Sequence, residues 1–149
     1  STINLFQQFQ ISVKNYFFLL EQQYYKDENV EIKKELFQKI MNSSEIILNE
    51  YISKDTEYKT FIEKNVNEKD DDLKLEGEYQ EWENLLLNYS NIICEYIFPL
   101  LQKIEFFKDD KARDNMIKII FKLIMCYQPK IRESIKDILM IVFQEIIIV

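Results

Sequence analysis

Apolar side chains recur every three or four positions along most of this 149-residue chain. Because an α-helix completes a turn in about 3.6 residues, that spacing gathers the apolar side chains on one helix face. We therefore predict an all-α fold with more than about 70% helix and no paired strands. The predicted helices span residues 3–25, 30–53, 54–65, 76–107, 112–127 and 129–146.

Turn and capping residues mark the ends of these helices. The polar run 42–44 falls inside the second helix, where it is either a break or a polar turn; we favour a continuous helix. Pro99 lacks an N–H and crowds the carbonyl four residues earlier, so we expect a kink near residues 95–98 or a new helix at Pro99. Residues 108–111 predict a turn with a capping aspartate, and Pro129 suits the start of the last helix.

The two C-terminal helices carry the densest apolar pattern. The helix over 112–127 is apolar nearly all round, so we expect neighbouring helices to cover it on several sides. We predict that Phe121, Leu123 and Ile124 are inaccessible to solvent. The last helix has a predicted outward face of Arg132, Glu133, Lys136, Asp137 and Gln144 and a predicted inward face of Ile131, Ile135, Ile138, Leu139, Val142, Phe143 and Ile146.

Composition supports the helical prediction but does not establish it. Glycine occurs once and proline twice, whereas sheet proteins need many tight turns built on these residues. The chain also has 17 lysines against two arginines, a bias typical of AT-rich genomes, which use few glycine and proline codons in any fold. The fold prediction therefore depends on the periodicity.

The net charge of −7 is distributed unevenly along the chain. Residues 63–84 hold nine acidic side chains against three lysines, and residues 108–136 hold eight basic side chains against four acidic ones. Within the acidic stretch we expect an exposed loop at about residues 66–74. Nucleic-acid binders usually carry an overall basic footprint, so we expect no nucleic-acid partner.

Several common chemistries are missing. The chain has no histidine, which excludes Ser-His-Asp and Cys-His catalysis and His-ligated zinc, and one glycine leaves no Gly-rich phosphate loop. The aspartates at 70–72 are consecutive rather than alternating as calcium ligands are, and Glu78 and Glu81 lack the Glu-x-x-His pairing of di-iron sites. Cys94 and Cys126 lie among apolar residues, as buried free thiols in a reducing compartment do. We predict no enzyme activity, no cofactor and no metal site.

No stretch is long enough to predict a membrane span, which requires about 18 uninterrupted apolar residues. The two nearest candidates, residues 116–126 and 138–149, are short and contain charged side chains. We therefore expect a single cytoplasmic domain over residues 1–149, either free-standing or part of a larger helical scaffold.

The segment 112–146, about a quarter of the chain, resembles a HEAT or armadillo repeat. An apolar helix and a tight turn are followed by a helix that opens with an aliphatic–arginine pair, as the second helix of such repeats commonly does. The usual aspartate of the turn is replaced by Tyr127-Gln128, and no second copy recurs at a fixed period. The matching positions of the second helix are Ile131, Arg132, Ile135, Ile138 and Leu139.

The resemblance implies a stack of antiparallel helix pairs that serves as a binding scaffold. The apolar end at residues 146–149 would then contact a neighbouring helical repeat. The alternative is a closed antiparallel bundle whose last helix docks in the core. Either arrangement comprises five to seven helices.

We expect this chain to be a non-enzymatic protein–protein interaction or scaffold module whose partners are other proteins. The candidate partner-binding residues are basic and lie near the C-terminus, with Trp82 as either a core anchor or an exposed hot spot. The alternative is a regulatory helical domain of a membrane-associated assembly, such as a channel, trafficking or coat complex, docked by its basic face. An enzyme subunit with an unrecognised active site is a third interpretation. The basic candidates are Lys118, Lys122, Arg132 and Lys136.

Overall fold

The computed structural model describes residues 2–66 and 73–147, with side chains over 7–66 and 73–145. Helical residues make up 92% of the described chain, which contains no strand, and this confirms the all-α prediction. Most of the loop expected at about 66–74 lies outside the described residues. The elements are α1 (Thr2–Lys26), α2 (Val30–Asn65), α3 (Leu73–Ile92), a π-helical turn η1 (Ile93–Ile97), α4 (Phe98–Lys103), a 3-10 turn η2 (Phe106–Lys108), α5 (Asp110–Ile124) and α6 (Pro129–Ile147).

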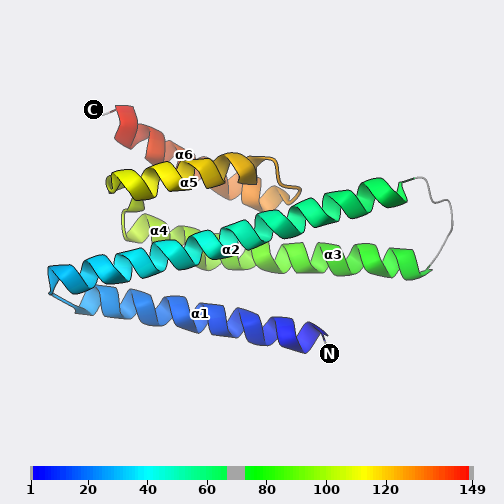
Figure 1. Cartoon of the computed structure of the whole chain (residues 1–149), viewed down its shortest axis with the longest axis horizontal. Helices are drawn as coiled ribbons and strands as arrows, with labels where there is room; N and C mark the ends of the chain where they lie inside the picture. The colour runs from blue at the N-terminus through cyan, green and yellow to red at the C-terminus, as the bar shows by residue number, and fades with distance from the viewer. Residues whose placement is uncertain (1, 67–72, 148–149) are drawn as a thin grey trace.

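The helices run back and forth along the long axis of the molecule (Figure 1). Each long helix is antiparallel to the preceding one, and α5 and α6 form a hairpin at one side. The long helix α2 contacts α1, α3 and α5, while η1 contacts α1, α2 and α6. The core is therefore centred on α2 and η1, where Ile40, Leu48, Ile93 and Ile97 are fully buried.

Helix α2 is continuous, whereas the sequence predicted separate helices over 30–53 and 54–65. Asn29 caps its start, since the Asn29 side chain accepts hydrogen bonds from the backbone N–H groups of Glu31 and Ile32. The polar run 42–44 is helical, as favoured. The polar interval that suggested a break holds Asp55, which is buried against α5 rather than exposed in a turn.

The path through Pro99 explains the π-helical turn. Pro99 has no N–H, and its ring would crowd the carbonyl of Glu95 in a regular helix. In η1 the Phe98 N–H donates to the Ile93 carbonyl, five positions back, so the backbone widens just before the proline. Pro99 then lies in the first turn of α4, in agreement with the irregularity predicted near residues 95–98.

The end of α4 and the start of the last two helices also follow from local signals. Helix α4 ends at Lys103, before the end predicted at residue 107. Asp109 caps α5 by accepting a hydrogen bond from the Ala112 N–H at 2.9 Å, as predicted for the 108–111 turn. Helix α6 begins at Pro129, also as predicted.

The predicted burial of α5 on several sides is wrong. Leu123 is buried as expected, but the Phe121 side chain is 61% exposed and Ile124 is also exposed. Helix α5 packs on α2, α6 and η2 through one face only, and no described element covers the opposite face. Phe143 of α6, predicted to face inward, is likewise exposed, whereas Ile131, Ile135, Ile138 and Val142 are buried.

Adjacent positions in α5 therefore differ sharply in their predicted contribution to stability. Ile120→Ala removes a fully buried side chain and should lower the free energy of unfolding by about 2–5 kcal/mol. Phe121→Ala, at an exposed position, should lower it by less than about 1 kcal/mol. Urea unfolding of both variants measures the difference. Equal losses would show that the α5 face is assigned incorrectly.

Candidate functional site

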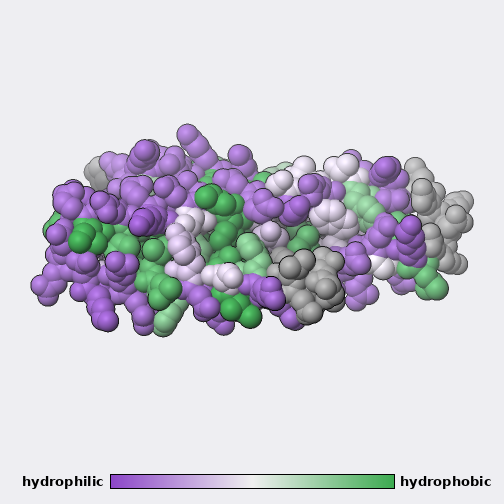
Figure 2. Space-filling view, turned by 60° about the horizontal axis from the view of Figure 1, so that its bottom comes forward, coloured by the Kyte–Doolittle hydropathy of each residue, from purple (hydrophilic) through white to green (hydrophobic). Residues whose placement is uncertain are grey.

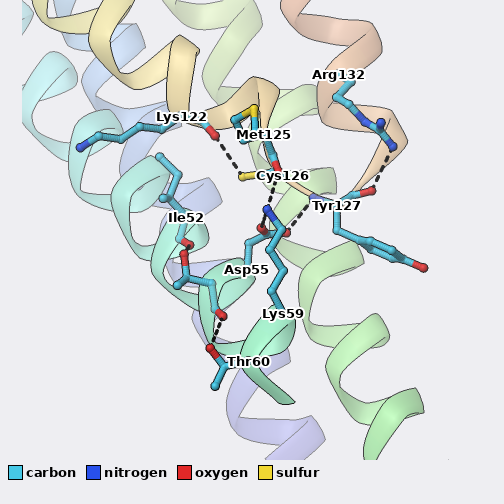
Figure 3. Close-up of polar contacts among 10 residues, drawn as sticks. Ile52, Asp55, Lys59, Thr60, Lys122, Met125, Cys126, Tyr127 and Arg132 are labelled. Carbon is cyan, nitrogen blue, oxygen red and sulfur yellow. Dashed lines mark hydrogen bonds and ion pairs between the residues drawn. The ribbon is translucent and has the colours of Figure 1, made fainter. Parts of the chain in front are cut away.

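The carboxylate of Asp55 ties α2 to the turn between α5 and α6 (Figure 3). Asp55 is 1% exposed, and one of its oxygens accepts a hydrogen bond from the Tyr127 backbone N–H at 2.8 Å. Its other oxygen lies 3.1 Å from Lys59 Nζ, one turn along α2. A buried charge is costly unless it is paired and hydrogen-bonded, and both partners are present here.

Lys59 and Tyr127 extend this contact. The Lys59 ammonium also donates to the Met125 carbonyl, so one side chain bridges the Asp55 carboxylate and the turn. The Tyr127 carbonyl accepts from the Arg132 guanidinium at 3.2 Å, and the Tyr127 ring packs edge-on against Tyr58 of α2. The turn is thus held on α2 by backbone and ring contacts together.

Trp82 belongs to an aromatic cluster between α2 and α3. Its ring stacks on Tyr58 with centroids 5.9 Å apart, and Phe61 lies at 6.4 Å from it. Tyr79 meets Phe61 edge-on at 4.9 Å. Trp82 is partly buried against the core, so the structure places it as a packing residue at the edge of the acidic stretch.

The four basic candidates do not converge on one point. Lys118 and Lys122 lie on α5 and Arg132 and Lys136 on α6, and all four are exposed. Figure 3 shows Lys122 and Arg132 on opposite sides of the turn, with their side chains pointing away from each other. Their role in partner binding stays a prediction. Of the described side chains, no acidic one in residues 63–84 forms an ion pair with any of these four cations.

A depression lies beside the Asp55 contact, where α2, α5 and the turn meet. Its volume is about 360 Å³, and we call it the α5 depression. It has a charged rim and an apolar wall, with the buried Asp55 and Cys126 at its floor. The lining residues that carry the argument below are Ile52, Thr56, Lys59, Phe121, Lys122 and Met125.

A second surface lies on α1. Ile11, Phe18 and Leu19 are all more than half exposed, with Leu19 at 63%. An apolar groove of about 270 Å³ also lies between α1 and α2, lined among others by Tyr16 and Ile46. We call these five residues the α1 surface. Figure 2 brings the α1 side of the molecule toward the viewer and shows hydrophobic side chains grouped in the middle of this face.

The α1 surface carries no charge. Helix α1 contains three charged side chains, Lys14, Glu21 and Lys26, and the first two have partners within the fold. The Lys14 ammonium lies 4.9 Å from the centre of the Tyr96 ring, and Glu21 pairs with Lys103 at 2.8 Å. Sequence reasoning missed this surface as a site. Its signal was present in the extra aromatic residues of α1 and in the scarcity of charge across that helix.

The two thiols are poorly suited to nucleophilic chemistry. Burial, and then the Asp55 charge, raise the pKa of Cys126 to about 12. Burial also raises the pKa of Cys94. Both are free cysteines and remain protonated at neutral pH, whereas a reactive cysteine requires a lowered pKa. Within the described residues, no cluster of three or more acidic or cysteine side chains is arranged to hold a metal ion.

Comparison with protein-family models, with curated proteins and with solved structures finds no match to this chain. No helix in the described ranges has the length and apolar character needed to cross a membrane.

The raised pKa of Cys126 predicts a loss of stability at alkaline pH. Above pH 9.0, its ordinary pKa, the thiol of the unfolded chain loses its proton while the folded chain keeps it up to about pH 12. The free energy of unfolding should therefore fall by up to about 1.4 kcal/mol per pH unit in this window. Cys126→Ala should flatten the fall, as urea unfolding between pH 8 and about pH 10 will show. Identical pH profiles for the two proteins would contradict the assignment.

Proposed function

We propose that this chain is a non-enzymatic protein-interaction module that binds a partner protein through the α1 surface. The observation that carries the proposal is an exposed helix face with several large apolar side chains and few charged ones. In a chain with 30% charged residues, the exposed faces of the other helices mix apolar side chains with charged ones. The cores of protein–protein interfaces are depleted of charge and enriched in aromatic residues, as this face is.

The shape of the α1 surface supports the same function. Phe18 and Leu19 are exposed on α1, and the groove between α1 and α2 offers an apolar recess lined by Tyr16 and Ile46. Projecting and recessed apolar features side by side offer the complementarity on which interface hot spots depend. Contiguous exposed apolar patches on folded proteins commonly mark such contacts.

Other features support a non-enzymatic interaction role and a reducing compartment. The chain has no histidine, and both thiols have raised pKa values. The free thiols suit a reducing compartment such as the cytoplasm. The antiparallel α5–α6 hairpin is compatible with a helical-repeat scaffold, so a neighbouring helical unit is among the partners we propose.

Affinity capture with matched variants tests the proposal. The double substitution Phe18→Ser and Leu19→Ser removes apolar surface without adding charge and should leave the core intact. Val66→Ser with Leu73→Ser removes exposed apolar surface far from α1 and serves as the control. Proteins captured from source cells by the wild type and the control should be lost with the α1 variant, at unchanged thermal unfolding. An identical set of captured proteins for all three would overturn the proposal.

A further inference from the structure

The α5 depression has exposed apolar and basic side chains that a ligand could contact. Phe121 on α5 is 61% exposed, and Met125, which caps the C-terminal end of that helix, is 72% exposed. Ile52 and Thr56 face them from α2 across the depression. Two lysines, Lys59 and Lys122, are among its lining residues. The α5 depression therefore combines exposed apolar side chains with lysines in its lining.

The charges of this region are not balanced within the described chain. Lys59 is neutralised by Asp55, but no described carboxylate lies within ion-pair distance of Lys122. Helical spacing places Lys111 and Lys118 on the same exposed side of α5, where Asp114 supplies the opposing charge. The exposed side of α5 is consequently positive, although the chain as a whole carries −7.

We propose that the α5 depression binds an acidic amphipathic helix of a partner protein, an inference that rests on the proposed interaction function. Two apolar side chains of that helix, three or four positions apart, pack on Phe121 and Met125. Methionine adapts to apolar partners of different shape, which suits such a contact. Carboxylates of the partner helix beside this apolar pair form ion pairs with Lys122 and with Lys118, one turn earlier on α5. This is helix-in-groove recognition with charge setting the orientation.

Two other occupants fit less well. An anionic membrane surface is flat, whereas the site is a depression between α2 and α5. A second copy of this chain offers an acidic helix in α3. However, the Tyr79 and Trp82 side chains of α3 are packed on Phe61 and Tyr58, so they cannot fill the depression.

Selection from a displayed library of helical peptides tests the inference on the full chain. The library varies Asp, Glu, Lys, Arg, Gln, Leu and Phe at the surface positions of a stable helix, and wild-type protein is the bait. Enriched peptides are then titrated by fluorescence anisotropy against the wild type and against Lys122→Glu. Lys39→Glu, the same charge change at an exposed position of α2 outside the depression, is the control.

We expect enrichment of acidic peptides with apolar residues three or four positions apart. Lys122→Glu should weaken their binding about tenfold or more, and Phe121→Ser should do the same. Lys39→Glu should change it by less than about twofold. Binding should also weaken as salt rises, because the contact depends on opposite charges.

Other outcomes overturn the inference and separate it from the proposed function. Neutral or basic peptides, no enrichment, or binding insensitive to Lys122→Glu and Phe121→Ser would each exclude an acidic helix at this place. Peptides lost only with the Phe18→Ser and Leu19→Ser variant would support the interaction function through α1 and remove the α5 site. Flotation with phosphatidylserine vesicles, or self-association in sedimentation equilibrium, that is abolished by Lys122→Glu would assign the depression to lipid or to a second copy.

Discussion

A buried carboxylate is stable only when it is paired, and one partner of Asp55, the Tyr127 N–H, lies 72 positions later in the chain. One Asp55 oxygen accepts a hydrogen bond from the Tyr127 N–H, and the other forms an ion pair with the Lys59 ammonium. Lys59 also donates a hydrogen bond to the Met125 carbonyl. These contacts fix where the α5–α6 hairpin lies on α2. Because the cost of leaving such a charge unpaired is several kcal/mol, they also restrict the register in which the hairpin docks.

The surfaces follow from that placement. With the turn held on α2, the inner face of α5 is buried and its outer face, with Phe121 and Met125, is left uncovered by the described chain. At the other side of the bundle, α1 uses one face against α2 and presents outward a face with few charged side chains. We therefore propose different partners for the two surfaces: one that packs on the apolar side chains of α1, and an acidic helix that binds the basic depression beside α5.

Periodicity predicted the fold class and most helix positions, since capping residues such as Asp109 and the proline at 129 act locally. It could not predict the continuity of α2, because Asp55 looks like a turn residue until its distant partner Tyr127 is known. Periodicity also overestimated the burial of Phe121. An apolar side chain would gain from burial, but the sequence does not show whether another helix covers it. The basic candidates were found to be exposed, but their division between two sides of a turn depends on tertiary structure.

Hydrogen exchange at the Tyr127 amide tests the central role of Asp55 most directly. In the structure this N–H donates to the Asp55 side chain, so its protection reports on that single contact. We expect the wild-type Tyr127 amide to be protected, and Asp55→Ala, which removes the acceptor, to speed its exchange while the Ile120 amide in the core of α5 keeps its protection. Free exchange of Tyr127 in the wild-type protein, or exchange unchanged by Asp55→Ala, would contradict the account.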